Sequence, residues 1–170
     1  MKRLKEVLLL FFLLVLLSCN NEPSQQKEVS SKSKGSNFTG VELVQLDGQP
    51  IDWDQYKGKA VFINFWATWC KPCIEEMPSI RVIKDKLKDA NIVFLLASDE
   101  TAQQIEKFKQ KNNYDFQFVR VTNLEQLGIM AIPTTYIFDP AGKLVFSEMG
   151  YRKWDNNENL SMVSNIAGVK

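Results

Sequence analysis

Residues 60–73 read AVFINFWATWCKPC and carry the strongest structural signal in the chain. The first part, 60–66, is almost wholly apolar, which is typical of a strand that is buried on both faces of a sheet. Pro72 favours the first turn of a helix, where the missing N–H of proline costs nothing. The sequence therefore predicts a buried strand that leads directly into a helix, with cysteines at the start of that helix.

Hydrophobic patterning on either side of this stretch predicts further strands and helices. Short apolar runs bounded by turn residues predict strands at 41–46, 91–97, 116–121, 134–138 and 143–149. Amphipathic spacing predicts helices at 70–89, 101–112 and 156–166, and a brief helix at 122–129. Asp47-Gly48 is a hairpin-turn signal after the first strand, and the last two strands are close enough to form an antiparallel pair. The order predicts an α/β fold with a central mixed sheet flanked by helices and an N-terminal β-hairpin.

The predicted helix after the cysteines has a clear apolar face. Its spacing places four side chains on one side, namely Met77, Ile80, Ile83 and Leu87. Pro78 lies inside this helix and predicts a kink, because proline removes one helical hydrogen bond. For the helix at 101–112, the sequence predicts a cap near Ser98 or Asp99.

Length and composition narrow the possible chemistry. The chain has 170 residues, 21 Lys and Arg against 20 Asp and Glu, and no His. This length suits one folded domain, and the near-neutral charge gives no footprint for nucleic acid, so no nucleic-acid partner is predicted. Without His the chain alone cannot build a Ser-His-Asp triad, a Cys-His dyad or a His-ligated metal site. Cysteine is therefore the main candidate for chemistry.

The N-terminus reads as a targeting signal. Residues 1–18 contain a basic start and an unbroken apolar run at 7–17, which is too short to span a membrane but matches a secretory signal peptide. Residues 16–19, Leu-Leu-Ser-Cys, resemble a bacterial lipobox. That resemblance implies cleavage before Cys19 and lipidation of its sulfur. A plain signal peptide or an uncleaved anchor, with Cys19 incidental, is the alternative.

Two segments follow the predicted cleavage site. Residues 19–37 are rich in Ser, Gln, Asn, Lys and Glu, and such a composition cannot bury enough surface to offset its ordering entropy. We predict that they form a lipidated flexible tether and that residues 38–170 form the folded domain. The chain is thus expected to be exported and lipid-anchored to the bacterial cell envelope, with the domain facing the periplasm or extracytoplasmic space.

The spacing of Cys70 and Cys73 at a helix start has a specific chemical use. Free N–H groups and the helix dipole favour an anion there, so Cys70 is predicted to be the thiolate nucleophile. Cys73, one turn further, is placed to attack the resulting mixed disulfide. A static disulfide and half of a zinc site are the structural alternatives. Zinc usually takes four nitrogen or sulfur ligands, which the mature domain lacks, so no metal is predicted.

Two separate motifs resemble a known family. WATWCKPC is similar to the active-site segment of the thioredoxin superfamily. With Glu76 and Pro78, the pattern W-C-x-P-C-x-x-E-x-P resembles the TlpA/ResA group of exported, membrane-tethered thiol–disulfide oxidoreductases. Residues 132–139, IPTTYIFD, resemble the cis-proline loop and following strand of that group. The resemblance covers about residues 38–168 and implies a thioredoxin-like fold, with a β/α segment inserted at 91–118.

The resemblance also implies roles for individual residues. Glu76 is implied to transfer the proton, because Asn64 occupies the place of the buried Asp of ordinary thioredoxins and cannot titrate. Pro133 is implied to be the cis-proline that faces the two sulfurs and exposes the backbone of Ile132 to a substrate chain. Trp69 is expected to cover Cys70 as part of the docking surface.

The function implied by the resemblance is a membrane-tethered extracytoplasmic thiol–disulfide oxidoreductase that acts on protein thiols and disulfides. The resemblance favours a reductase supplied by a membrane-embedded thiol electron donor, with oxidation as the other direction. Cytochrome c biogenesis is one setting that fits. No cofactor is predicted, because the redox pair lies in the chain. Alternatives are a thiol peroxidase of the same fold, although the chain lacks a T-x-x-C segment at this site, and a redox-inert thioredoxin-like binding module.

Overall fold

The computed structural model describes residues 38 and 40–169. The predicted signal peptide at 1–18, the predicted tether at 19–37 and the lipidation site Cys19 lie outside the described residues. Within the described part of the chain, no helix is long and apolar enough to cross a lipid bilayer.

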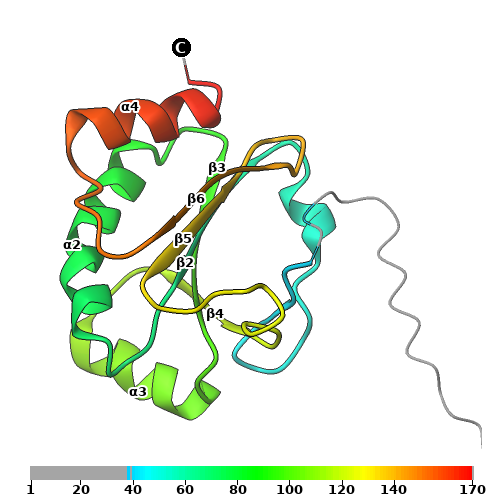
Figure 1. Cartoon of the computed structure of the whole chain (residues 1–170), viewed down its shortest axis with the longest axis vertical. Coiled ribbons are helices and arrows are strands. Elements are labelled where there is room, and N and C mark those ends of the chain that lie inside the picture. The colour runs from blue at the N-terminus through cyan, green and yellow to red at the C-terminus, as the bar shows by residue number, and fades with distance from the viewer. Residues whose placement is uncertain (1–37, 39, 170) are drawn as a thin grey trace, which may run out of the picture. The chain divides into compact units, whose positions relative to one another are not determined.

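The described chain alternates strands and helices in an order close to the predicted one (Figure 1). The strands are β1 (Leu43–Val44), β2 (Ala60–Phe65), β3 (Ile92–Ser98), β4 (Gln117–Val121), β5 (Thr134–Phe138) and β6 (Leu144–Met149). The helices are the 3-10 helix η1 (Trp53–Tyr56) and the α-helices α2 (Lys71–Lys86), α3 (Ala102–Asn112) and α4 (Asn157–Ile166).

All the strands join one mixed sheet in the order β1-β4-β3-β2-β5-β6. β2, β3 and β4 run parallel, whereas β1, β5 and β6 each run antiparallel to a neighbour. The mixed sheet was predicted from the sequence. Phe65, the last residue of β2, pairs with Thr134, the first residue of β5. This register brings the segment before α2 and the segment before β5 to the same end of the sheet.

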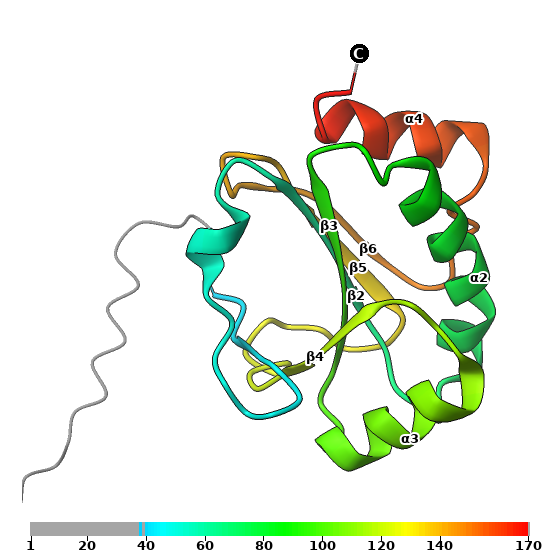
Figure 2. The ribbon, with the colours of Figure 1, turned by 180° about the vertical axis from the view of Figure 1, so that it is seen from behind.

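The sheet is covered on both faces, which explains why β2 is buried along its whole length and apolar except at Asn64. Helices α2, α3 and α4 lie on one face, and the N-terminal segment with the chain between β4 and β5 lies on the other (Figures 1 and 2). Successive side chains of a strand point to opposite faces. Phe62 accordingly packs with the helices, whereas Val61 and Ile63 pack with the N-terminal segment. β2 is the central strand that delivers the chain to Cys70.

Helix α2 follows the predicted pattern with a shorter end. Its predicted apolar positions Met77, Ile80, Ile83 and Leu87 are all buried. The helix continues through Pro78 and ends at Lys86 with Leu87 as its cap, three residues earlier than the sequence predicts. Cys70 is the N-cap residue, which places both cysteines in the first turn as predicted.

The predicted helix at 122–129 is wrong. This segment forms hydrogen-bonded turns, in which Leu127 N–H bonds to the Asn123 carbonyl and Gly128 N–H to the Glu125 carbonyl. The buried Asn123 side chain binds the backbone of the N-terminal segment instead, with its amide donating to the Gly40 carbonyl at 2.6 Å. This tertiary contact fixes the start of the segment and prevents regular helix formation. Leu127 still packs inward.

The N-terminal hairpin is shorter than predicted. Only two residues form β1, and the return side is a single bridge between Val44 and Pro50, followed by a hydrogen bond from Ile51 N–H to the Leu43 carbonyl at 2.9 Å. Pro50 cannot donate a ladder hydrogen bond, which limits the pairing. The Asp47-Gly48 turn is present, with Gly48 N–H bonded to the Gln45 carbonyl.

The cap of α3 also differs from the prediction. Ser98 is the last residue of β3, and the N-cap is Thr101. The Thr101 hydroxyl accepts from Gln104 N–H, and the Gln104 side chain accepts from Thr101 N–H, which forms a capping box. The Ser98 hydroxyl instead bonds to Glu100, donating to its Oε2 and accepting from its N–H.

Candidate redox site

Cys70 and Cys73 form a disulfide at the start of α2. Cys73 is fully buried and Cys70 nearly so. As the N-cap residue, Cys70 receives a hydrogen bond at its Sγ from the Cys73 N–H, with a nitrogen–sulfur distance of 3.3 Å. An N–H group that points at this sulfur, at the positive end of the helix dipole, stabilises a thiolate there once the disulfide is opened.

Glu76 lies on the next turn of α2 and has no exposed surface. Its Oε1 accepts a hydrogen bond from Asn64 Nδ2 at 2.5 Å, and its Oε2 accepts one from the Arg152 backbone N–H at 3.0 Å. Burial raises the pKa of Glu76 to about 7, although the hydrogen bonds from Arg152 and Asn64 oppose the rise. The carboxyl can therefore take up or release a proton near neutral pH. Glu75, by contrast, is exposed and lies 3.7 Å from Lys71.

The partners of Glu76 come from distant parts of the chain. Asn64 is the last residue but one of β2, and its amide also donates to Thr135 Oγ1 on the neighbouring strand β5 at 3.1 Å. Arg152 follows β6, and its side chain bonds to Asn159 Oδ1 at 2.7 Å and pairs with Glu148. These contacts hold the Arg152 N–H in place beside Glu76. Arg152 was not predicted from the sequence. It binds Glu76 through its backbone N–H, and the type of a residue does not show which backbone N–H will be a donor to the site.

The loop before β5 lies at the same end of the sheet as Cys70. The Ile132–Pro133 peptide bond is cis, in agreement with the resemblance. Ile132 packs against the cluster that contains both cysteines. The Pro133 carbonyl accepts from Gly150 N–H at 2.7 Å, whereas neither backbone polar group of Ile132 has a hydrogen-bond partner within residues 38 and 40–169. Ile132 therefore offers both a donor and an acceptor to an incoming chain.

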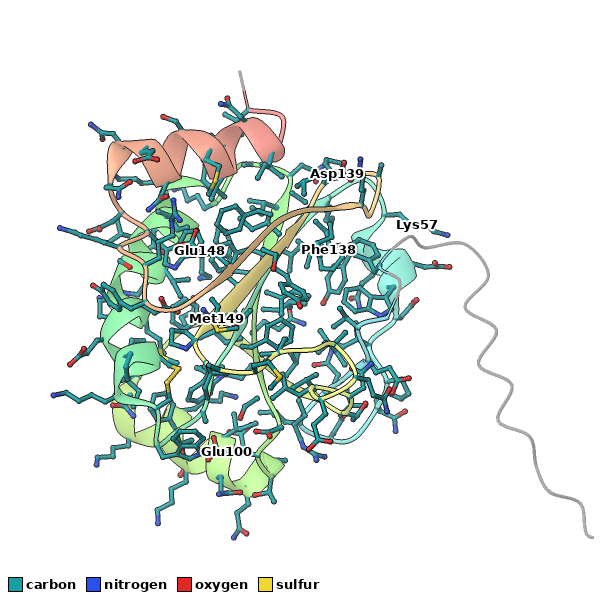
Figure 3. The ribbon with its side chains drawn as sticks, viewed as in Figure 1. Lys57, Glu100, Phe138, Asp139, Glu148 and Met149 are labelled. Atoms are coloured by element: carbon teal, nitrogen blue, oxygen red, sulfur yellow. A yellow bond between two sulfur atoms is a disulfide. The ribbon has the colours of Figure 1, made fainter. Side chains whose placement is uncertain are left out.

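Several large apolar side chains near this loop face solvent. Trp69, which precedes Cys70, is 74% exposed, and Met130 is 86% exposed. Trp69 was expected to cover Cys70, yet most of its side chain is in solvent. Met149, which Figure 3 labels on β6, and Tyr151 are also exposed and flank Gly150. Exposed apolar side chains gathered around one site are typical of a surface that binds another molecule.

The family follows from comparison with known proteins. The model of the AhpC/TSA family matches residues 34–147, well over half of the chain. The chain belongs to the AhpC/TSA family. It is 30% identical over 128 residues to the thiol-disulfide oxidoreductase ResA of Bacillus cereus strain ATCC 10987 / NRS 248, and the alignment covers 72% of this chain and 71% of that protein. This AhpC/TSA member is thus a thiol-disulfide oxidoreductase of the ResA type, as the sequence motifs predicted.

Solved structures confirm the thioredoxin-like fold. A putative thiol-disulfide oxidoreductase from Bacteroides vulgatus superposes with a TM-score of 0.64 at 25% identity, covering 74% of this chain and 90% of that one. The exposed lipoprotein thioredoxin Etrx1 of Streptococcus pneumoniae strain TIGR4 superposes with a TM-score of 0.59 at 23% identity, covering 76% and 99%. The second likeness bears on the fold alone.

Proposed function

We propose that this protein reduces disulfide bonds of protein substrates outside the cytoplasm, with Cys70 as the nucleophile and Cys73 as the resolving cysteine. The observation that carries the proposal is the Cys70–Cys73 disulfide at the N-terminus of α2, at the same end of the sheet as Ile132, whose backbone has no hydrogen-bond partner among the described residues. A nucleophile and a place for a substrate chain thus meet at one end of the sheet.

The proposed reaction has two exchange steps. In the reduced protein, the Cys70 thiolate attacks one sulfur of the substrate disulfide, forms a mixed disulfide and expels one substrate thiolate. The Cys73 thiolate then attacks the Cys70 sulfur, re-forms the Cys70–Cys73 disulfide and expels the second substrate thiolate. Glu76 accepts the Cys73 thiol proton. The two expelled thiolates take up this proton and one from water, which replaces the proton that Cys70 gave to water when it ionised. Two electrons pass to the substrate, and a dithiol donor restores the reduced protein.

Docking of a protein segment is supported by the surface around the disulfide. We propose that a substrate chain lies extended beside Ile132 and hydrogen-bonds to its backbone, as in strand addition. Pro133 shapes this loop, and its own carbonyl is already bonded to Gly150. Trp69 and Met130 supply apolar contacts on either side of the chain.

We favour reduction of the substrate disulfide over its formation. This direction comes from the resemblance to the TlpA/ResA group, and the similarity to the thiol-disulfide oxidoreductase ResA supports that resemblance. An oxidising compartment would keep the cysteines in the disulfide form, so a membrane-embedded thiol donor is proposed to supply electrons. With a chemical dithiol in place of the donor, the protein is expected to speed reduction of a protein disulfide well above the dithiol alone. Faster peroxide consumption without faster disulfide reduction would instead support the thiol peroxidase.

A lipid anchor is proposed for the N-terminus, on the basis of the lipobox-like residues 16–19. We expect that Cys19→Ala abolishes incorporation of labelled fatty acid and moves the protein out of the membrane fraction. Acyl chains contribute about 0.8 kcal/mol per buried CH2, and Cys19 is the proposed attachment point. Ser18→Ala, which keeps a small residue before the cysteine, is the control. Unchanged labelling of Cys19→Ala would contradict the anchor.

A further inference from the structure

Glu100 holds the loop that precedes the redox cysteines. It lies after β3, two residues before α3, and Figure 3 shows it at the end of the molecule where α3 begins. Its Oε2 accepts a hydrogen bond from the Thr68 backbone N–H, and its Oε1 accepts one from the Thr68 hydroxyl, both at 2.6 Å. Hydrogen bonds to a carboxylate are among the stronger ones in proteins, and two of them on one residue fix its orientation.

Thr68 belongs to a tight turn that ends at the nucleophile. The Cys70 N–H donates to the Ala67 carbonyl at 3.1 Å, so Thr68 and Trp69 are the central residues of this turn. The N–H of the first central residue has no partner within such a turn. Glu100 supplies that partner from 32 residues away in the chain. The position of Cys70 is therefore tied to β3 as well as to α2.

Glu100 is itself held in place by hydrogen bonds from Ser98 and Arg120. Ser98 Oγ donates to Glu100 Oε2 at 3.2 Å, and Arg120 Nε on β4 donates to the Glu100 backbone carbonyl at 3.0 Å. Ser98 thus restrains the Glu100 side chain and Arg120 restrains its backbone, so Glu100 holds Thr68 more firmly than a freely rotating surface carboxylate would. Sequence analysis did not single out Glu100, because it stands between two predicted elements and belongs to no motif.

We propose that Glu100 is a positioning residue for Cys70. Through Thr68, it fixes the turn that places the Cys70 sulfur against the N–H groups at the start of α2 and presents Trp69 to the partner. The proposal rests on the proposed function, since it assigns Glu100 a part in the reactivity of Cys70. Small displacements of a reacting group, about 1 Å, can slow a reaction by about 100-fold.

The test compares Glu100→Ala with Glu100→Gln in the full-length reduced protein. Both variants remove the negative charge, but the Gln oxygen can still accept from Thr68 N–H and its amide can donate to the Thr68 hydroxyl. The rate of Cys70 alkylation by iodoacetamide, mapped by mass spectrometry, is expected to be about tenfold lower in Glu100→Ala than in Glu100→Gln. If Glu100 only stabilised the fold, its replacement would lower the midpoint of unfolding, and Cys70 would be alkylated at the same rate in the two folded variants.

Two further variants complete the test. Asp99→Ala removes an exposed neighbouring carboxylate and is expected to alkylate like the wild type. Thr68→Val removes only the hydroxyl that donates to Glu100, and about threefold slower alkylation is expected. This variant still tests the proposal if Glu100→Ala does not fold. Equal rates in Glu100→Ala and Glu100→Gln, or a wild-type rate in Thr68→Val, would overturn the proposal. A wild-type Cys70 that resists alkylation would instead contradict the proposed function.

Discussion

Replacing Cys70 by serine is expected to lower disulfide-reductase turnover by about 10³-fold or more, because the remaining thiol, Cys73, has no exposed surface from which to attack a substrate disulfide. Cys73→Ser is expected to be equally inactive in turnover but to accumulate a covalent complex with its substrate. In that variant Cys70 can still attack, and the resolving sulfur is missing. The difference in burial supports this assignment, since Cys73 has no exposed surface whereas Cys70 keeps 4%.

The measurement is gel electrophoresis without reductant, followed by mass spectrometry of the trapped partners. A double variant with both cysteines replaced is the matched control and should trap nothing. The roles are reversed if Cys70→Ser traps substrate and Cys73→Ser does not. Full activity of the double variant in cells would favour the redox-inert binding module over the oxidoreductase.

The parts of the fold that the sequence predicts well are those in which local pattern and tertiary packing agree. Residues 60–66 are apolar except for Asn64, because helices cover one face of β2 and the N-terminal segment covers the other. Pro72 and Cys70 mark the start of α2 for reasons that are local to that turn. Both signals depend on neighbours in sequence, which is why the strand, the helix and the two cysteines lie where the sequence placed them.

The parts that the sequence does not predict depend on contacts between distant segments. Residues 122–129 have helical spacing, yet the side chain of Asn123 binds the backbone of Gly40 and Glu42, over 80 residues earlier in the chain. The Arg152 N–H on Glu76 and the Glu100 carboxylate on Thr68 arise in the same way. The cis bond before Pro133 was predicted only by the resemblance to a family. A single sequence gives the residue types but not which residues contact one another in the folded protein.

Glu76→Gln is expected to change how the stability of the oxidised protein depends on pH. The folded protein raises the pKa of Glu76 from 4.5 to about 7, so the native state binds more protons than the unfolded chain between these values. The free energy of unfolding therefore falls as pH rises through this window, by about 3 kcal/mol in total. Gln stays neutral and lacks this loss. Urea denaturation should show that the free energy of unfolding of the variant, relative to that of the wild type, is higher at pH 8 than at pH 4.5.

The geometry makes Gln a mild replacement at this position. Asn64 Oδ1 is buried without a hydrogen-bond partner, whereas Asn64 Nδ2 donates to both Glu76 and Thr135. A flip of the Asn64 amide would let Oδ1 accept from the Gln amide and from the Thr135 hydroxyl, while the Gln oxygen accepts from Arg152 N–H. Asn64 Nδ2 would then replace Oδ1 as the buried atom without a partner. The fold of the variant should thus be retained, and a change in redox kinetics can be assigned to the lost proton acceptor.

The same variant is expected to slow resolution of the mixed disulfide by about 100-fold at neutral pH, because general acid–base groups contribute about 10²–10⁴ in rate. In the wild type, the resolution rate should rise with pH through about 7, where Glu76 loses its proton and becomes able to accept the one from Cys73. The rise near 7 should be absent from Glu76→Gln. Glu75→Gln changes an exposed carboxylate on the same helix and should keep the wild-type profile. If Glu76→Gln also keeps it, Glu76 does not move the proton, and its burial has only a structural effect.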